Sequence, residues 1–291
     1  MMIREPVVAG RFYPMDRESC LREIAEMKPP ADVSDLPDRP VAGVVPHAGW
    51  TFSGETALAV LTVIKGRRTP KTFVLFGATH RLVGTNTLFA SGGWETPMGV
   101  AEVDERLGRE VLGRAADILI DDPHGHEGEH SIEVQVPLIQ HLFPEARILP
   151  IAVPAGETAA VLGRIVGRTI GDLETDAVCI GSTDLTHYGS MYGFTPQGTG
   201  PEAVRWVRDE NDRRMVDLMV RLDAEGAVPE AASRRNACGA GAVAATMAAA
   251  REMGARRGVL VGYTTSFDVM RAKFGRADYD ATVGYAGIVF G

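Results

Sequence analysis

The sequence predicts an α/β fold in which one central, mostly parallel sheet is flanked by helices. Short apolar runs rich in Val and Ile, each bounded by Gly, Pro or Asp, have the pattern of buried strands. Periodic helical stretches fall between most of them, and this alternation is typical of a sheet covered on both faces. Hydrophobic residues make up 45% of the 291 residues, enough for one large core. We therefore expect residues 1–291 to form a single domain.

The elements follow in chain order. The expected strands are residues 41–46, 72–76, 147–153, 177–181, 258–264 and 282–290. The expected helices are residues 16–27, 53–64, 104–115, 131–142, 157–170, 202–222 and 240–252. Ser53 and Asp104 begin two of these helices, because their side chains can accept a hydrogen bond from a free N–H there. We expect the later strands to pair antiparallel at one end of the sheet.

Charge and cysteine content exclude several classes of protein. The net charge is −8 and the basic residues are scattered, which disfavours a surface for nucleic acid. An odd, sparse count of three cysteines argues against a disulfide framework. No window approaches the roughly 18 apolar residues of a membrane helix, and the N-terminus lacks the apolar stretch of a signal peptide. We expect a cytoplasmic protein that binds neither nucleic acid nor membranes.

Two histidines follow directly after expected strands. His47 lies just after residues 41–46, and His80 lies just after residues 72–76. Ligand sites in such sheets form beyond the carboxyl ends of the strands, so both side chains can converge on one point. Neutral imidazole is the commonest protein ligand for Fe, Zn and Cu. Taken alone, each His is more simply interpreted as a loop residue that satisfies a turn carbonyl.

A third group of histidines lies among acidic residues before an expected helix. We expect His124 and His126 at the surface, in an exposed acidic loop. His130 stands at the mouth of the helix and shares a face with Glu133. This position makes His130 the candidate functional residue of the group.

Asp184 and His187 follow the expected strand at residues 177–181. A carboxylate–imidazole pair fixes the tautomer of the His and raises its basicity, which suits a general base. The alternative is that Asp184 caps the turn and that His187 is a satisfied loop residue.

Cys238 opens a helix rich in small residues. A helix N-terminus lowers the pKa of a thiol, and thiolate is a good ligand for Fe, Zn or Cu as well as a nucleophile. The alternative is a small residue chosen for tight packing. Cys20, in a surface-type helix, and Cys179, in an apolar strand, lack this setting.

Together, these segments resemble the successive signatures of the Memo family, over nearly the whole chain. The matching segments are Ala9-Gly10-Arg11-Phe12-Tyr13-Pro14, Pro46-His47-Ala48-Gly49-Trp50, Ser53-Gly54, Gly77-x-x-His80, Glu129-His130-Ser131-Ile132-Glu133, Ser182-Thr183-Asp184-x-x-His187 and Asn236-x-Cys238-Gly239.

The resemblance implies the fold of class III extradiol dioxygenases, with His47, His80 and Cys238 as metal ligands. His187 and His130 then match histidines that in those enzymes act on the substrate hydroxyl and on oxygen. Memo-like proteins of bacteria and archaea are often encoded with a radical-SAM protein and an AMMECR-type protein, as an AmmeMemoRadiSam system. Animal members are described as signalling proteins that bind phosphotyrosine-containing peptides.

One departure from the dioxygenase pattern concerns the third ligand. Cys238 stands where those enzymes have a carboxylate, and a thiolate is softer and itself oxidisable. This puts aromatic ring cleavage in doubt and favours a different redox step, or occupancy by copper or zinc.

Three functions remain open. The first is a metal-dependent oxidoreductase that acts on a small molecule, with Fe(II) bound by His47, His80 and Cys238. In this account His187, oriented by Asp184, removes a substrate proton, and His130 stabilises bound oxygen or a developing anion. The second is a metal- or peptide-binding interaction protein without turnover. The third is zinc-dependent hydrolysis with Glu133 or Asp184 as the base.

Overall fold

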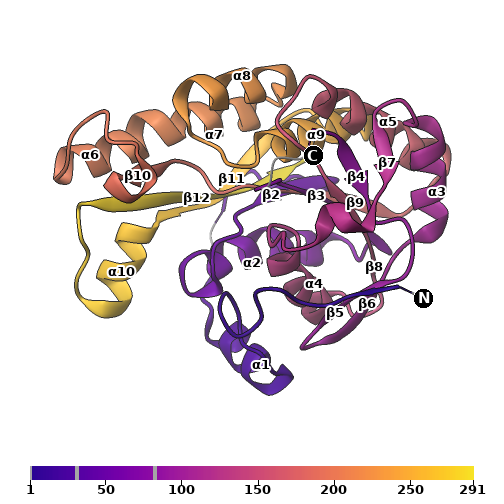
Figure 1. Ribbon diagram of the computed structural model, residues 1–291, viewed down its shortest axis with the longest axis horizontal. Coiled ribbons are helices and arrows are strands. Elements are labelled where there is room, and N and C mark those ends of the chain that lie inside the picture. Colours follow the sequence, from indigo (N-terminus) through magenta and orange to yellow (C-terminus); the bar gives the residue numbers. More distant parts are fainter. Residues whose placement is uncertain (1, 30–32, 81–83) are drawn as a thin grey trace.

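A nine-stranded mixed sheet forms the centre of the computed structural model, which describes residues 2–29, 33–80 and 84–291. The strand order is β10-β12-β2-β9-β3-β8-β4-β7, with β11 beside β12 (Figure 1). The inner strands β2 (Ala42–Val45), β9 (Ala177–Ser182), β3 (Thr72–Gly77) and β8 (Arg147–Ala152) are parallel to one another. The predicted parallel core is therefore confirmed, with bounds within about two residues of those expected.

Antiparallel strands complete the sheet at both edges. On one side β12 (Ala281–Phe290) pairs antiparallel with β2, β11 (Gly258–Thr265) and β10 (His187–Gly189). On the other side β4 (Asn86–Leu88) runs antiparallel to β8, and β7 (Leu119–Asp121) runs parallel to β4. The antiparallel pairing of the later strands was expected, whereas β4, β7 and β10 were not.

A second, three-stranded sheet was also not expected from the sequence. It consists of β1 (Ile3–Arg4), β5 (Gly93–Thr96) and β6 (Gly99–Glu102). β1 pairs parallel with β5, which brings the start of the chain against residues about 90 positions later.

Helices cover both faces of the large sheet (Figure 1). α2 (Trp50–Arg67) packs on β2, β11 and β12, and α4 (Val136–Leu142) packs against α2. α9 (Ala240–Glu252) packs on the central strands from the opposite side, and α5 (Thr158–Asp172) packs against α9. The two helices approach so closely that a Cβ at Gly163 would lie 2.0 Å from the Ala245 carbonyl oxygen, so only glycine fits there.

Three helices differ from the prediction. α2 begins at Trp50 rather than at Ser53, whose hydroxyl donates to the Ala48 carbonyl inside the first turn. The helix expected at 131–142 is a 3₁₀ turn followed by α4. The helix expected at 202–222 is interrupted by a π turn. Its pieces are α6 (Pro201–Trp206), η4 (Val207–Asn211) and α7 (Asp212–Val220).

The chain also contains other helical elements. They are α1 (Arg17–Glu26), α3 (Glu105–Arg114), η1 (Pro123–His126), η2 (Glu133–Gln135), η3 (Ser190–Tyr192), α8 (Ala224–Arg234) and α10 (Ser266–Phe274). Asp104 caps α3 as predicted, by accepting the Leu107 N–H at 3.0 Å. Among the described residues, no helix is long and apolar enough to cross a membrane.

One continuous cluster of buried apolar side chains joins the sheet to these helices. It extends from Val8 near the N-terminus to Phe290 in the last strand. The parallel strands are apolar on both faces, since every residue of β2, β3 and β9 is buried. Polar side chains collect instead just beyond the carboxyl ends of these strands, and there the candidate site lies.

Candidate metal centre

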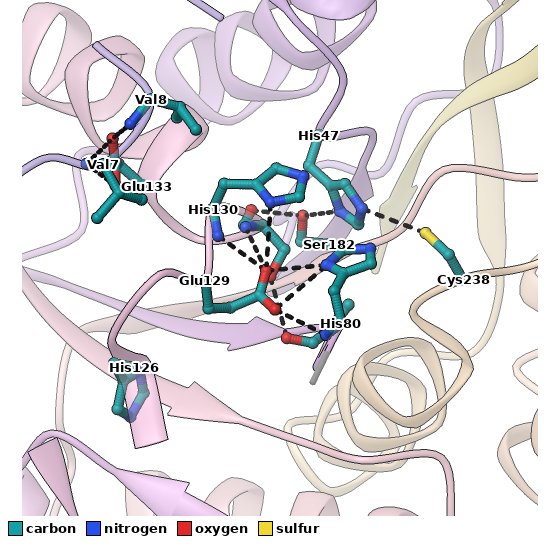
Figure 2. Close-up of polar contacts among 12 residues, drawn as sticks. Val7, Val8, His47, His80, His126, Glu129, His130, Glu133, Ser182 and Cys238 are labelled. Carbon is teal, nitrogen blue, oxygen red and sulfur yellow. Dashed lines mark hydrogen bonds and ion pairs between the residues drawn. The ribbon is translucent and has the colours of Figure 1, made fainter. Parts of the chain in front are cut away.

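Three imidazoles meet beyond the carboxyl ends of the parallel strands (Figure 2). His47 follows β2, His80 follows β3, and His130 comes from the segment before η2. One ligand nitrogen from each lies within 4.8 Å of the others, a spacing at which the three could hold one metal ion. The convergence of His47 and His80 follows the expectation from their positions after strands.

The three rings have a defined mutual orientation. His80 and His130 are stacked, with ring centroids 4.7 Å apart and an interplanar angle of 18°. His47 meets both edge-on, at centroid distances of 5.2 Å to His80 and 5.5 Å to His130. The exposed fraction of the side chain is 22% for His130 and 38% for His80, whereas His47 is only 1% exposed. The cluster is therefore closed at His47 and open to solvent at His80.

Cys238 approaches His47 from the side away from His130 (Figure 2). Its Sγ lies 3.2 Å from Nε2 of His47 and accepts the Asp184 N–H at 3.3 Å. The backbone of Cys238 also donates to the Asp184 carbonyl, at 3.1 Å. At the next residue, Gly239, a Cβ would lie 2.2 Å from the Ser182 carbonyl oxygen. Only glycine allows the chain before α9 to come this close to the end of β9.

Ser182 fixes the tautomer of His47. The Ser182 hydroxyl donates its single proton to the Ser131 carbonyl at 2.7 Å, so it can only accept from Nδ1 of His47, 2.8 Å away. Nδ1 therefore carries the proton, and Nε2 keeps a lone pair directed at Cys238. Burial, followed by the charges of His80 and His130, lowers the pKa of His47 well below its ordinary value.

Glu129 plays the corresponding part for His80. Its carboxylate lies 3.0 Å from Nδ1 of His80 and accepts the His80 backbone N–H at 2.8 Å. The same carboxylate accepts the N–H groups of His130 and Ser131 at 2.9 and 2.8 Å. A carboxylate that holds the far nitrogen of a ligand histidine is a recurrent feature of metal sites. Sequence reasoning missed Glu129, although its place next to His130 in the acidic segment was the available signal.

The charges of His80 and Glu129 are coupled. A hydrogen bond with Cys238, and then the bond with Glu129, raise the pKa of His80 to about 10. Burial alone would raise the pKa of Glu129, but the hydrogen bonds and charge of His80, together with the Ser131 N–H, outweigh it, and the pKa falls below its usual range. In the absence of a cation, His80 is therefore an imidazolium between Cys238 and Glu129.

The thiol behaves differently from the expectation. Burial raises the pKa of Cys238, and the hydrogen bond with His80 opposes this only in part. The predicted lowering by the helix N-terminus is wrong, because Cys238 lies ahead of the first turn of α9 and desolvation dominates.

The expected pairing of Asp184 with His187 is also wrong. The Asp184 carboxylate accepts the backbone N–H of His47 at 2.7 Å, so this buried side chain positions the first histidine instead. Burial raises the pKa of Asp184 to about 7, against the hydrogen bonds from the His47 and Ala48 backbones. Nδ1 of His187 lies 3.1 Å from the Leu185 carbonyl, to which it donates. The sequence favoured the pair because the spacing suited it, but the turn directs the two side chains to different partners.

His187 nevertheless lies near enough to the centre for the charge of His80 to act on it. The ring of Tyr192 meets it edge-on at 5.1 Å. Burial lowers the pKa of His187, the Leu185 bond opposes this, and the charge of His80 adds to the lowering. His187 is therefore neutral near pH 7, with its proton on Nδ1 and an acceptor lone pair on Nε2.

Glu133 is a structural carboxylate. It forms a buried ion pair with Arg4 at 2.8 Å and accepts the Val7 and Val8 N–H groups at 2.9 Å and the Tyr13 hydroxyl at 2.8 Å. These contacts occupy both oxygens, which removes Glu133 as the base of a hydrolase.

The histidines of the acidic segment divide in an unexpected way. His124 is exposed as expected, and it pairs with Glu127. His126 is fully buried, edge-on to Phe89 and Trp94, so the prediction of a surface position is wrong. Arg4 donates to the His126 carbonyl at 3.1 Å and stacks over Trp94 at 4.1 Å. The segment that carries Glu129 and His130 is thus anchored to the N-terminal strand.

An α/β sheet with three histidines able to hold a metal ion beyond its strand ends defines a candidate metalloprotein. The chain belongs to the Memo family: the family model described as Memo-like protein matches residues 4–289. A MEMO1 family protein of Pyrococcus abyssi is 38% identical over 299 residues, and one of Thermococcus onnurineus is 36% identical over 305. Each alignment covers 99% of both chains.

A solved structure supports the fold. An uncharacterized protein from Escherichia coli K12 superimposes with a TM-score of 0.54 and 12% sequence identity, covering 87% of this chain and 100% of that one. At this identity the likeness concerns the fold alone.

Proposed function

We propose that this protein is a metal-dependent oxidoreductase acting on a small molecule, with His47, His80 and Cys238 holding one iron(II) ion. The observation that carries the proposal is the contact of 3.2 Å between Sγ of Cys238 and the unprotonated Nε2 of His47. Two ligands of one tetrahedral ion, with bonds of about 2.0–2.3 Å, lie about 3.6 Å apart. The present spacing is therefore close to that of a ligand pair.

The donor set fits a first-row transition metal. Both histidines have Nδ1 hydrogen-bonded, to Ser182 and Glu129 respectively, so each is left with Nε2 as the donor. Imidazole and thiolate together suit iron, copper and zinc. We expect Fe(II), with copper and zinc as alternatives; a redox-active ion would supply the electron transfer that the protein side chains cannot.

The remaining histidines have properties suited to a substrate. His187 is neutral and has a lone pair on Nε2, so it can accept a proton from a substrate hydroxyl. His130, half-buried and stacked on His80, can donate a hydrogen bond to a developing anion. Asp184 acts indirectly, by holding the backbone of His47.

Cobalt substitution tests the ligand set. A Co(II) ion bound by Cys238 gives a thiolate charge-transfer band in the near ultraviolet and visible bands of a tetrahedral site. We expect both in the wild-type protein, loss of the charge-transfer band in Cys238→Ser, and loss of binding in His47→Ala. Cys20→Ser, which removes a buried thiol elsewhere, is the matched control and keeps both bands.

The same experiment separates the two arrangements of ligands. If His130→Ala abolishes binding while Cys238→Ser leaves it unchanged, the ion belongs to the three histidines and the proposed thiolate ligand is wrong. If wild-type protein takes up neither cobalt nor iron, the metal centre itself is wrong.

A second candidate is a binding protein without turnover, working with radical-SAM and AMMECR-type partners. The soft, oxidisable thiol of Cys238 in the ligand set favours it. Oxygen uptake by iron-loaded protein distinguishes the two candidates. Substrate-dependent uptake that is lost in His187→Ala supports the enzyme, whereas tight metal binding with the same uptake in both proteins supports the binding protein.

A further inference from the structure

A buried carboxylate lies behind the turn that carries His187. Asp212, the first residue of α7, is completely buried. Its Oδ1 accepts the Thr186 backbone N–H at 2.9 Å and also the Thr186 hydroxyl. Its Oδ2 accepts the Tyr263 hydroxyl at 2.7 Å. The backbone N–H and the hydroxyl of Thr186, the residue directly before His187, thus both donate to one carboxylate.

The π turn before α7 makes this arrangement possible. Asn211 and Asp212 are consecutive residues, and both reach Thr186, since the Asn211 amide donates to the Thr186 hydroxyl oxygen at 2.9 Å. In a regular α-helix consecutive side chains point about 100° apart, so they do not share a partner easily. The wider turn over Val207–Asn211 brings both inward, and such turns occur frequently at functional sites.

The neighbouring strand leaves space for the carboxylate. A Cβ at Gly284 of β12 would lie 1.8 Å from Oδ2 of Asp212, so any side chain there would displace it. Gly284 also donates to the Thr186 carbonyl at 3.1 Å and accepts the Leu185 N–H at 2.8 Å. The turn is therefore held between β12 and Asp212.

The same network reaches the Cys238 segment. The Asn211 amide donates to the Arg234 carbonyl at 3.1 Å, and the buried Asn236 donates to the Asn211 carbonyl at 2.8 Å. Asn236 precedes Cys238 by two residues. One buried set of hydrogen bonds thus spans the supports of both His187 and Cys238.

We propose that Asp212 is a positioning residue of the candidate metal centre, which holds the Thr186–His187 turn so that Nε2 of His187 stays available to substrate. This inference rests on the proposed function, in which His187 accepts a proton from a substrate. Its structural content, the position of the Thr186–His187 turn, does not depend on a bound ion, so it can be tested without metal.

Nitrogen NMR of the histidine rings in the metal-free, full-length protein provides the test, because the ¹⁵N shifts report which nitrogen carries the proton. In wild type we expect His187 as the Nδ1–H tautomer. Asp212→Ala should shift the His187 ring signals and lose the single tautomer. Asp212→Asn should restore them, because its carbonyl oxygen can still accept the Thr186 N–H.

Thr169→Ala is the matched control. It removes another buried hydroxyl bond, from Thr169 to the Ile165 carbonyl within α5, away from the centre. It should leave the His187 signals unchanged. Equal shifts in Thr169→Ala and Asp212→Ala, or unchanged His187 signals in Asp212→Ala, would overturn the proposal. Should Asp212→Ala not fold, Thr186→Val, which keeps the backbone bond, must shift His187 in the same direction by less; no shift refutes the proposal.

Cobalt affinity separates this inference from the proposed function. Asp212 and Asn211 share Thr186, and Asn211 is bonded to Asn236 in the Cys238 segment, so we expect Asp212→Ala to weaken cobalt binding by roughly tenfold. Absence of binding in wild type would refute the metal centre but leave the NMR result on Asp212 standing. Wild-type affinity in Asp212→Ala, together with an unchanged His187 spectrum, would refute the role of Asp212.

Discussion

Glu129 holds His80 by two atoms at once: its carboxylate lies 3.0 Å from Nδ1 of the ring and accepts the His80 backbone N–H at 2.8 Å. One buried side chain therefore sets both the position of the histidine along the chain and the rotation of its imidazole. Because the same carboxylate also accepts the His130 N–H, the two stacked rings share one support.

Replacing Glu129 should weaken metal binding. Glu129→Gln keeps the shape but removes the charge that fixes Nδ1–H of His80, and loss of such a partner typically costs 10–100-fold in affinity. Competition with a chromophoric chelator measures this. Glu127→Gln, an exposed carboxylate two residues away that pairs with His124, is the control and should bind as wild type. Wild-type affinity in Glu129→Gln would show that His80 is not oriented from this side.

Metal affinity should rise with pH. His80 has a pKa raised to about 10, and the pKa of Cys238 is also raised, so both carry protons near pH 7 that a cation must displace. By mass action, affinity then increases about tenfold per pH unit for each proton released. Calorimetry in buffers of different ionisation enthalpy counts these protons. Metal binding to Cys238→Ser should release about one proton fewer than metal binding to the wild-type protein. An affinity independent of pH from 6 to 8 contradicts the assignment of these ligands.

Arg4 should be essential for stability. It forms a buried ion pair with Glu133, and removing one partner of such a pair typically costs about 3–5 kcal/mol, because the other charge stays buried. We expect Arg4→Met to lower the free energy of unfolding by this amount in urea titrations. Arg22→Met, which breaks the exposed pair with Glu18, should cost less than about 0.5 kcal/mol. Similar small losses in both variants would mean that the pair contributes little.

His126 should make the fold sensitive to acid. Burial, and then the charge of Arg4, lower its pKa from 6.5 to about 4, so the unfolded chain binds the proton more readily. The contribution of His126 to the free energy of unfolding is fully present above pH 6.5. It is lost as the pH falls towards 4, and the loss is about 2 kcal/mol between pH 7 and pH 5.

His126→Gln should therefore reduce the loss of unfolding free energy between pH 7 and pH 5. Urea titrations at both pH values check this, with His124→Gln as the exposed control. The same loss in His126→Gln as in wild type would show that other groups cause the acid sensitivity.

The central strands were predictable because their signal is local. β2, β3, β9 and all of β8 after its first residue are buried on both faces, so each is a short, mostly apolar run in the sequence. The short strands β4 to β7 carry no such run; β4, β5 and β7 pair with distant segments, and β6 completes a hairpin with β5. The break in the helix expected at 202–222 could not be predicted for a similar reason. Asn211 and Asp212 are polar residues that are buried because they form hydrogen bonds with the distant Thr186.

The candidate site was predictable only in part. His47, His80 and Cys238 could be singled out because each stands next to a strand end or a helix start. The supports could not, because Ser182, Glu129 and Asp184 act on residues 49 to 137 positions away in the chain. Position in the sequence therefore singled out the candidate donors, whereas only the folded chain shows which residues orient them.

The separation of 191 residues between His47 and Cys238 has a consequence for biosynthesis. A ribosome must have released nearly the whole chain before sulfur and imidazole can meet, so an emerging N-terminal portion has no complete binding site. The ion would then bind only late, after most of the chain is translated, and it would cross-link the first and last thirds of the polypeptide.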